Sequence, residues 1–295
     1  MIKNKSKLEY SFNEFIYSNI EAFENGCVDY LGINIAASYG QRSIFKIYYN
    51  DKASRYNSHP LIDFLKDNEM VRYLTVVDDK DNKNNYDRLR IDIGLKNRTN
   101  KNMINVFEWL KDYTKIFEIN AEKIKKISEM KVTELDGYNY AGLYFLGFVS
   151  KNEEISTLKC HYFNRICEDP DILHENIQFA DKYYLKFISN VGISEFIELA
   201  QLSGEALKVC GGHLWMVGTD YAISSPSKYK IYIKNPSYTY EGLIKIFSST
   251  KYKYLQQQIF SVKNWNDNHK KFNCEGFAIC MDSNKKLSIN FYFIM

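Results

Sequence analysis

Five pairs of short strands recur along this 295-residue chain, and the second strand of each pair carries basic, polar or aromatic residues at alternate positions. Successive side chains of a strand point to opposite faces, so these residues share one face and the aliphatic residues share the other. An apolar core does not tolerate unpaired lysines, whereas a closed barrel with a polar interior can hold an anionic ligand. The five second strands are expected at residues 44–48, 88–92, 158–162, 228–232 and 287–292.

Between the hairpins, the hydrophobic period changes from two to about 3.6, which is typical of amphipathic helices. Gly192 interrupts the longest of these stretches, so that stretch is expected to form two helices. An open sheet of this width would leave bare edges, so a closed one is favoured. The pattern predicts an α+β fold, a ten-stranded antiparallel β-barrel built from five helix–hairpin repeats and ringed by α-helices, and residues 1–295 form a single domain because no linker divides them. The helical stretches are 8–23, 58–70, 102–130, 168–210 and 238–265.

Composition excludes several classes of protein. With 39 basic and 36 acidic residues the net charge is only +3, which argues against a partner such as nucleic acid. There is no apolar signal core and no membrane span, so a cytoplasmic protein is expected. The 6 cysteines lack metal-ligand or disulfide spacing, and the acidic run Asp78 to Asp81 is read as a turn, so no metal site is predicted.

The chain resembles the ABBA aromatic prenyltransferases, whose barrel consists of five repeats with ten antiparallel strands inside a ring of helices. The resemblance covers nearly the whole chain and is nearest in character to the bacterial cyanobactin-type peptide prenyltransferases. It implies a transferase that moves an isoprenyl group from dimethylallyl or geranyl diphosphate to an electron-rich aromatic ring and releases diphosphate. The segments that carry it are Lys46-Ile-Tyr48, Lys159-Cys-His161, Leu214 to Thr219, Lys228-Tyr-Lys230-Ile-Tyr232, Gly276 to Ile279 and Leu287 to Phe293.

The resemblance also implies roles for the inward residues. Fixed cations stabilise a diphosphate leaving group as its charge develops, and tyrosine faces attract an allylic cation while excluding water. The diphosphate is expected to contact Lys46, Arg90, Lys159, His161, Lys228, Lys230, Lys286 and Asn290. The cation and the acceptor are expected to contact Tyr30, Tyr48, Tyr232 and Tyr292.

The general base is the point at which the chain departs from the family. Many members place a glutamate on the first strand, where this chain has Tyr30, Gly32 and Asn34 on the inward face. Two other carboxylates are candidates for the catalytic base. Glu275 begins the ninth strand, and Asp29 would reach the cavity if a bulge turned it inward.

The acceptor and the cofactor stay open at the level of the sequence. The last strand runs to Met295 without a following helix, which favours an uncovered mouth and a tyrosine or tryptophan side chain of a peptide as acceptor. The alternatives are a small phenol, naphthol, phenazine or indole, a ligand-binding barrel of the same fold without turnover, or a protein that docks a partner on its tyrosine-rich face. No tightly bound cofactor is expected, although Mg²⁺ can accompany the diphosphate.

Overall fold

The structure, a computed structural model, describes residues 13–15, 17, 19–36, 44–50, 60–69, 71–79, 88–95, 100–113, 115, 143–151, 154–163, 194–223, 227–249 and 252–295. The turn expected at 38–40 lies outside these residues, as do residues 80–85 and 224–226 of the turns expected at 78–85 and 224–227. Asp78 and Asp79 belong to a strand, so their prediction as part of a turn is wrong. Residues 116–130 and 168–193 of the helical stretches expected at 102–130 and 168–210 also lie outside the described residues.

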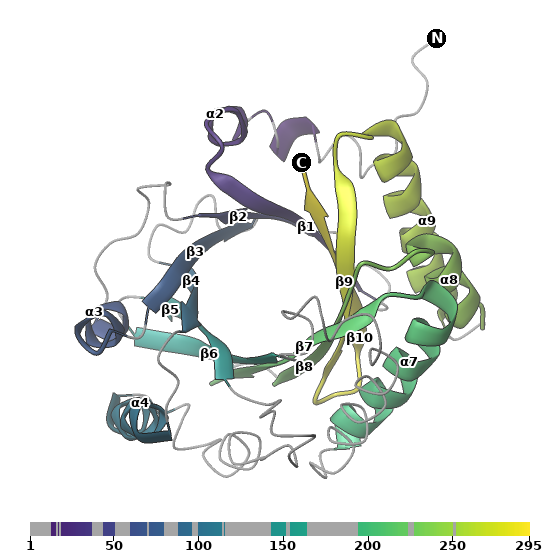
Figure 1. Cartoon of the computed structure of the whole chain (residues 1–295). Helices are drawn as coiled ribbons and strands as arrows, with labels where there is room; N and C mark the ends of the chain where they lie inside the picture. Colours follow the sequence, from purple (N-terminus) through teal and green to yellow (C-terminus); the bar gives the residue numbers. More distant parts are fainter. Residues whose placement is uncertain are drawn as a thin grey trace, which may run out of the picture.

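The strands form one closed antiparallel ring (Figure 1). Each strand pairs with its neighbours in the sequence, and β1 closes the ring by pairing with β10. The predicted antiparallel barrel with helices outside it is thereby confirmed. The strands are β1 (Val28–Ala36), β2 (Ile44–Tyr49), β3 (Val71–Asp79), β4 (Arg88–Leu95), β5 (Leu143–Lys151), β6 (Glu154–Phe163), β7 (His213–Ala222), β8 (Lys228–Lys234), β9 (Asn273–Asp282) and β10 (Leu287–Ile294).

Alternation along each strand separates an apolar outer face from a polar inner one. On β2, Phe45, Ile47 and Tyr49 are fully buried in the main hydrophobic core, whereas Lys46 and Tyr48 between them are only partly buried. The same core takes in the apolar faces of the helices. The main core therefore lies between the sheet and the helices, and the interior of the barrel is left to polar and aromatic side chains.

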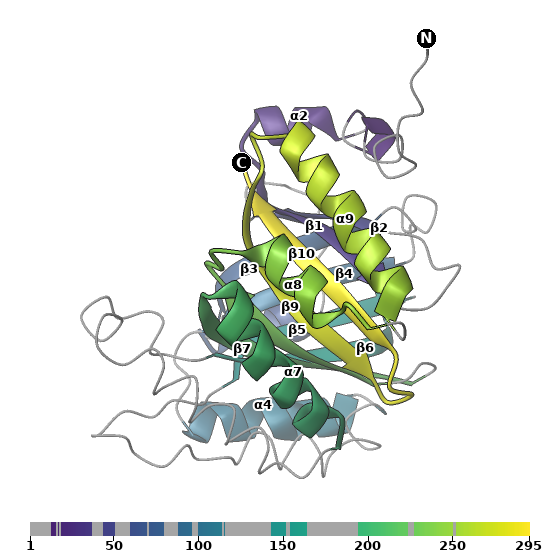
Figure 2. The same ribbon diagram turned by 90° about the vertical axis from the view of Figure 1, so that its right-hand side faces the viewer.

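The described helices pack against the outside of the barrel (Figures 1 and 2). α7 packs on β8 and β9, while α9 packs on β1. Trp265 of α9 lies with its ring 5.0 Å from that of Phe293, and Gln258 Nε2 donates to the carbonyl oxygen of Ala36 at 2.6 Å. These contacts fix α9 across the seam where β1 meets β10. The helices are α2 (Ile20–Glu24), α3 (Pro60–Asp67), α4 (Asn100–Tyr113), α7 (Ser194–Cys210), α8 (Thr239–Ile246) and α9 (Lys253–Asn268).

The stretch 238–265 holds two helices, so its prediction as one helix is wrong. α8 ends at Ile246, where the backbone N–H of Phe247 donates to the carbonyl oxygen of Leu243 and that of Ser248 donates to the carbonyl oxygen of Lys245. Ser248 and Ser249 follow, and serine competes with helical hydrogen bonding through its own hydroxyl. α9 then begins at Lys253.

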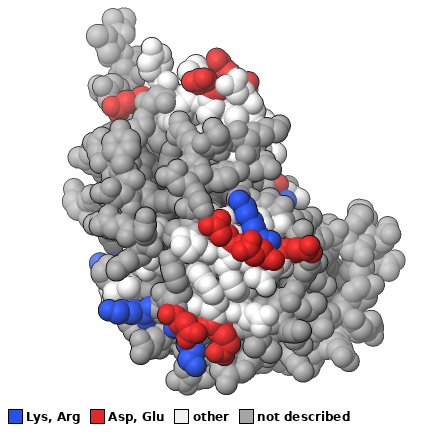
Figure 3. All heavy atoms as spheres, turned by 90° about the vertical axis from the view of Figure 1, so that its left-hand side faces the viewer, with Lys and Arg blue, Asp and Glu red and all other residues white. Residues whose placement is uncertain are grey.

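α3 and α4 lie on the opposite side of the barrel from α7, α8 and α9 (Figure 1). Leu61, Ile62 and Leu65 of α3 are buried, and described acidic and basic side chains are interspersed on this face (Figure 3). Among the residues that the structure describes, no helix combines the length and the apolar character needed to cross a membrane.

Candidate active site inside the barrel

Neighbouring strands place two carboxylates among lysines inside the barrel. Asp220 of β7 lies opposite Lys159 of β6 and Lys228 of β8 in the strand register. Lys230 Nζ lies 2.5 Å from Asp220 Oδ2, and Lys159 Nζ lies 3.9 Å from Asp92 Oδ1 on β4. Lys159 and Lys230 are both buried. We call Lys159, Lys230, Asp92 and Asp220 the lysine end of the interior.

Asp220 modifies the charge of the lysine end. Burial alone would raise the pKa of Asp220, but the ammonium groups of Lys230 and Lys159 outweigh burial and hold this pKa well below its usual range. The carboxylate is therefore ionised at neutral pH and offsets part of the positive charge. An anion that binds here has to compete with Asp220 for Lys230.

Four tyrosines line the interior next to the lysine end, and we call them the tyrosine row. Along this row, ring centroids are 6.4 Å apart for Tyr30 and Tyr48, 5.9 Å for Tyr48 and Tyr292, and 5.8 Å for Tyr292 and Tyr232. Burial raises the pKa of Tyr232 and Tyr292 well above the usual value, so both are neutral phenols. The rings of Tyr232 and Tyr292, inclined at 34° to each other, present neighbouring aromatic faces that suit a carbocation or a planar acceptor.

His161 joins the tyrosine row to the lysine end. Its Nε2 lies 3.0 Å from the hydroxyl oxygen of Tyr232, and its ring is buried. Burial first, and then the positive charge of Lys230, lowers the pKa of His161 to about 4. The imidazole is therefore neutral at pH 7, although it lies among charged side chains.

Inward-facing glycines make room for these side chains. A Cβ on Gly218 would lie 2.6 Å from Cδ2 of His161, and a Cβ on Gly147 would overlap Oδ1 of Asp92. On β1, a Cβ on Gly32 would lie 3.0 Å from Cε2 of Tyr48. Each glycine is thus a position where a larger residue would displace a side chain of the site.

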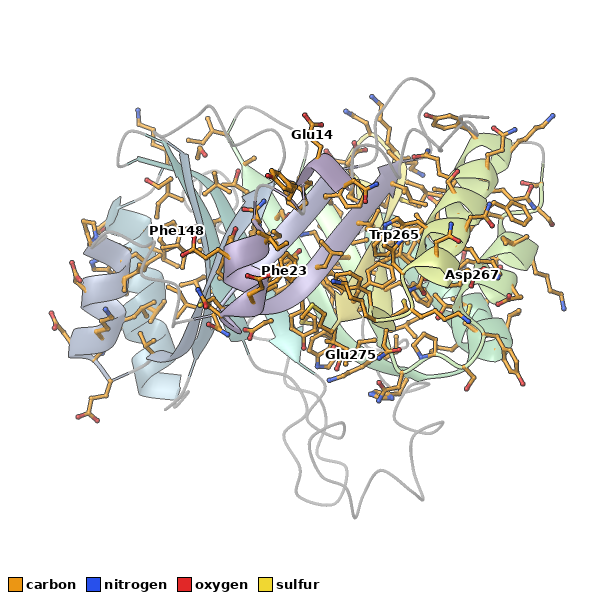
Figure 4. The ribbon with its side chains drawn as sticks, turned by 90° about the horizontal axis from the view of Figure 1, so that it is seen from above. Glu14, Phe23, Phe148, Trp265, Asp267 and Glu275 are labelled. Atoms are coloured by element: carbon orange, nitrogen blue, oxygen red, sulfur yellow. The ribbon has the colours of Figure 1, made fainter. Side chains whose placement is uncertain are left out.

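A second ion pair lies further along β8 and β9. Lys234 Nζ lies 2.9 Å from Glu275 Oε1 and 4.8 Å from the ring centre of Trp215. Figure 4 shows Glu275 at one end of the barrel. Burial raises the pKa of Tyr30 strongly, and the nearby carboxylate of Glu275, which shares a hydrogen bond with Tyr30, adds to this effect. We call Glu275, Lys234 and Trp215 the glutamate end.

Most of the predicted site residues that the structure describes come together in this interior. Asn290 is buried and accepts a hydrogen bond from Asn34 Nδ2, while Lys46 is partly buried opposite Gly32. Arg90 has the same strand parity as Asp92, but its side chain lies outside the described residues.

Two predicted residues do not join the interior group. Lys286 is exposed in the turn before β10, where its backbone N–H donates to Asp282 Oδ1, so the prediction that it faces inward is wrong. The register of β1 shifts between Val28 and Tyr30, which is the bulge that an inward Asp29 requires. Asp29 is nevertheless exposed, and its carboxylate accepts a hydrogen bond from Asn50.

The carboxylates of the lysine end were missed as site residues. Asp220 has the same parity as Gly218 on β7, but Asp220 lies on the first strand of its hairpin, and the repeated pattern was read from the second strands. The pairing of Lys159 with Asp220 and Asp92 depends on strand register, which alternation in one strand does not specify. Within the described ranges, no group of three or more His, Cys, Asp or Glu residues could hold a metal ion.

Solved structures with the same fold are known, although sequence comparison alone finds none. A scan against protein-family models gives no match, and neither does a search of curated proteins. AnaPT from Neosartorya fischeri superposes with a TM-score of 0.60 at 13% identity, over 90% of this chain and 78% of that one. A 6-dimethylallyltryptophan synthase from Micromonospora olivasterospora, in complex with DMASPP and Trp, gives a TM-score of 0.53 at 10% identity over 90% and 80%.

A third structure extends the comparison. A 5-dimethylallyl tryptophan synthase from Streptomyces coelicolor, also in complex with DMASPP and Trp, gives a TM-score of 0.55 at 9% identity over 90% and 78% of the two chains. The chain thus has the fold of the ABBA aromatic prenyltransferases, as its sequence resemblance predicted. At these identities the likeness defines the fold, and the chemistry has to be argued from the residues of this barrel.

Proposed function

We propose that this protein is an aromatic prenyltransferase that transfers a dimethylallyl or geranyl group from its diphosphate to an electron-rich aromatic ring. The observation that carries this proposal is that two buried lysines and a row of tyrosine rings share the interior of a prenyltransferase-type barrel, with His161 hydrogen-bonded to the row and close to the charge of Lys230. A donor that is anionic at one end and becomes a carbocation at the other matches this arrangement. The barrel is proposed to derive from five helix–hairpin repeats.

The lysine end acts on the leaving group. Breaking the allylic C–O bond leaves the electron pair on the diphosphate, and Lys159 and Lys230 stabilise the charge that develops there. Lys228, beside Asp220 in the register, and Lys46 are proposed to contribute further donors. Lys159 and Lys230 are already buried inside the barrel before the donor arrives, and the incoming diphosphate shares Lys230 with Asp220.

The tyrosine row acts on the organic part of the donor. The faces of Tyr48, Tyr232 and Tyr292 attract the allylic cation and exclude water, which would otherwise capture it. The acceptor is proposed to lie between this row and the glutamate end, with Glu275 accepting a hydrogen bond from its N–H or O–H group. Trp215 and Tyr30 then border the acceptor ring.

The preferred acceptor is a tryptophan or tyrosine side chain, either in a peptide or as the free amino acid. Two structural neighbours are dimethylallyltryptophan synthases in complex with DMASPP and Trp, which supports an indole acceptor. The small phenols, naphthols and phenazines remain the alternative. The carboxylates of Asp92 and Asp220 already engage lysines, so any Mg²⁺ is expected to enter with the donor, ligated by diphosphate oxygens.

Mass spectrometry tests the proposal directly. The protein is incubated with dimethylallyl or geranyl diphosphate and with free tryptophan, free tyrosine, Trp- and Tyr-containing peptides, or simple phenols, with and without EDTA. A mass gain of one isoprenyl group on an acceptor supports the proposal, and the acceptor that reacts fastest identifies the class. Donor binding without product for every acceptor would instead identify a binding barrel of the same fold.

A further inference from the structure

A chain of hydrogen bonds crosses the interior from the tyrosine row to the lysine end. Tyr292 and Tyr232 share a hydrogen bond between their hydroxyl groups, and their ring centres are 5.8 Å apart. The hydroxyl of Tyr232 lies 3.0 Å from Nε2 of His161. All three side chains lie on inward positions of β10, β8 and β6.

A transfer of protons toward His161 requires one direction of these hydrogen bonds. A phenol has one O–H, so a Tyr292 hydroxyl that donates to the oxygen of Tyr232 leaves the Tyr232 proton to point to His161. Nε2 of a neutral imidazole then accepts it, and Nδ1 carries the imidazole proton.

His161 lies where a negative charge arrives during the proposed reaction. Lys159 shares its strand, and charged groups face it from the other strands packed around it: Lys230 from β8, Asp220 from β7 and Asp92 from β4. In the free protein these charges and burial keep the imidazole neutral. When a diphosphate occupies the lysine end, its charge favours the imidazolium form. The basicity of His161 therefore rises as the leaving group forms.

We propose that Tyr292, Tyr232 and His161 form a proton relay that removes the proton from the alkylated acceptor ring. The inference rests on the proposed function and names what replaces a base on the first strand. Glu275 then orients the acceptor through its N–H or O–H group, while the relay takes the ring proton. Gly218 is part of the device, because a Cβ there would meet both the His161 and the Tyr232 ring, at 2.6 Å and 3.2 Å.

The prenyl transfer needs no reactant besides the donor and the acceptor. The allylic C–O bond breaks with its electron pair on the diphosphate, and an electron pair of the acceptor ring forms the new C–C bond. The resulting ring cation is a strong acid, and its C–H electron pair restores aromaticity as the proton passes to the Tyr292 oxygen. Tyr292 passes its own proton to Tyr232, and Tyr232 passes its own to His161 Nε2. The proton finally leaves with the diphosphate.

Because the two tyrosines are buried, the proton transfers along the relay are concerted. Because the pKa of both tyrosines is raised well above the usual value, neither persists as a tyrosinate while the proton moves. If His161 only oriented the Tyr232 ring, a glutamine in its place would serve equally well, because the glutamine side chain also accepts a hydrogen bond. This difference separates a relay from a purely structural contact.

The first experiment does not depend on turnover. In protein labelled with ¹⁵N-histidine, the His161 signals are assigned by their loss in His161→Gln. We expect Nδ1 protonated and Nε2 unprotonated at pH 7, with the imidazolium appearing more readily once a thio-diphosphate donor analogue is bound. A proton on Nε2 at pH 7 would reverse the hydrogen bond to Tyr232 and overturn the relay.

The second experiment measures turnover against pH. We expect His161→Gln to keep its affinity for the donor analogue, to lower kcat about 100-fold, and to lose the acidic limb of the wild-type profile. Gly218→Ala should act in the same direction, whereas His269→Gln, outside the barrel, should match the wild type. A wild-type rate in His161→Gln would overturn the relay alone. A wild-type protein without any prenylated product would overturn the proposed function, and the relay with it.

Discussion

The lysine end and the glutamate end are both built around an ion pair on β8, but water reaches them to different extents. The side chains of Lys230 and Asp220 are 5% and 18% exposed, against 27% and 17% for Lys234 and Glu275. Tyr232 lies between the two lysines on the strand. The comparison indicates that the lysine proposed to meet the leaving group is shielded from water, whereas the lysine beside the proposed acceptor position stays in contact with solvent.

Removing Lys230 should have the largest effect. In Lys230→Met we expect kcat/KM for the donor to fall at least about 100-fold, because a fixed donor to the leaving group is lost. The variant should also lose about 2 to 3 kcal/mol of stability, because removing the buried Lys230 leaves Asp220 without its closest ammonium partner. Steady-state kinetics and urea unfolding measure the two effects.

The matched control is Lys234→Met on the same strand. Because this lysine is more exposed, we expect a loss of stability below about 1 kcal/mol and donor kinetics within a few-fold of the wild type. The double variant Lys230→Met with Asp220→Asn should regain stability without regaining turnover. Equal losses in the two single variants would contradict the distinction between the ends.

A buried histidine also lies beside each end, His161 at the lysine end and His213 at the glutamate end. The two histidines should contribute differently to the loss of stability at acidic pH. The folded pKa of His161 is about 4, below the usual 6.5, so the unfolded chain takes up the proton first as the pH falls. Above pH 6.5 the free energy of unfolding does not depend on the protonation of His161. Between pH 6.5 and 4 it falls by about 3 kcal/mol because of this group. Urea unfolding at closely spaced pH values should show this slope, and His161→Gln should remove most of it.

His213, opposite Lys234, is the counterpart at the glutamate end. Its pKa is also lowered, by burial and then by Lys234, so it contributes a slope of the same sign. We expect His213→Gln to change the pH dependence less than His161→Gln does. If the larger change came from His213, the lysine end would not be the drier of the two.

Replacing Glu275 should change turnover moderately. In Glu275→Gln the amide can still accept a hydrogen bond, so we expect about a tenfold fall in kcat/KM for the acceptor and an unchanged affinity for the donor. Isothermal titration with a donor analogue and kinetics at varied acceptor concentration separate the two. A fall of several thousandfold in kcat would instead show that Glu275 is the base that removes the ring proton.

The sequence predicts the faces of the sheet better than it predicts the partners across it. Lys159, Lys230 and Tyr232 were placed inward because period-two alternation is local and strong. Their carboxylate partners come from other strands, and the register that pairs them is fixed by the closed ring. Alternation assigns a face only to residues within a strand, and the prediction failed for Lys286 because β10 begins at Leu287.

Two inward glycines offer the finest comparison, which is between the lysine end and the tyrosine row. Gly147→Ala should move Asp92 away from its position beside Lys159, while Gly32→Ala should move the Tyr48 ring, and each should cost about 1 kcal/mol of stability. We expect the first variant to alter only the KM for the donor, and the second to alter both donor binding and, because the Tyr48 ring packs against that of Tyr30, the preference among acceptors. Competition between a tryptophan and a tyrosine peptide, followed by mass spectrometry, measures that preference. If both variants changed only donor binding, the tyrosine row would belong to the donor site alone, and the acceptor would have to lie beyond Tyr48.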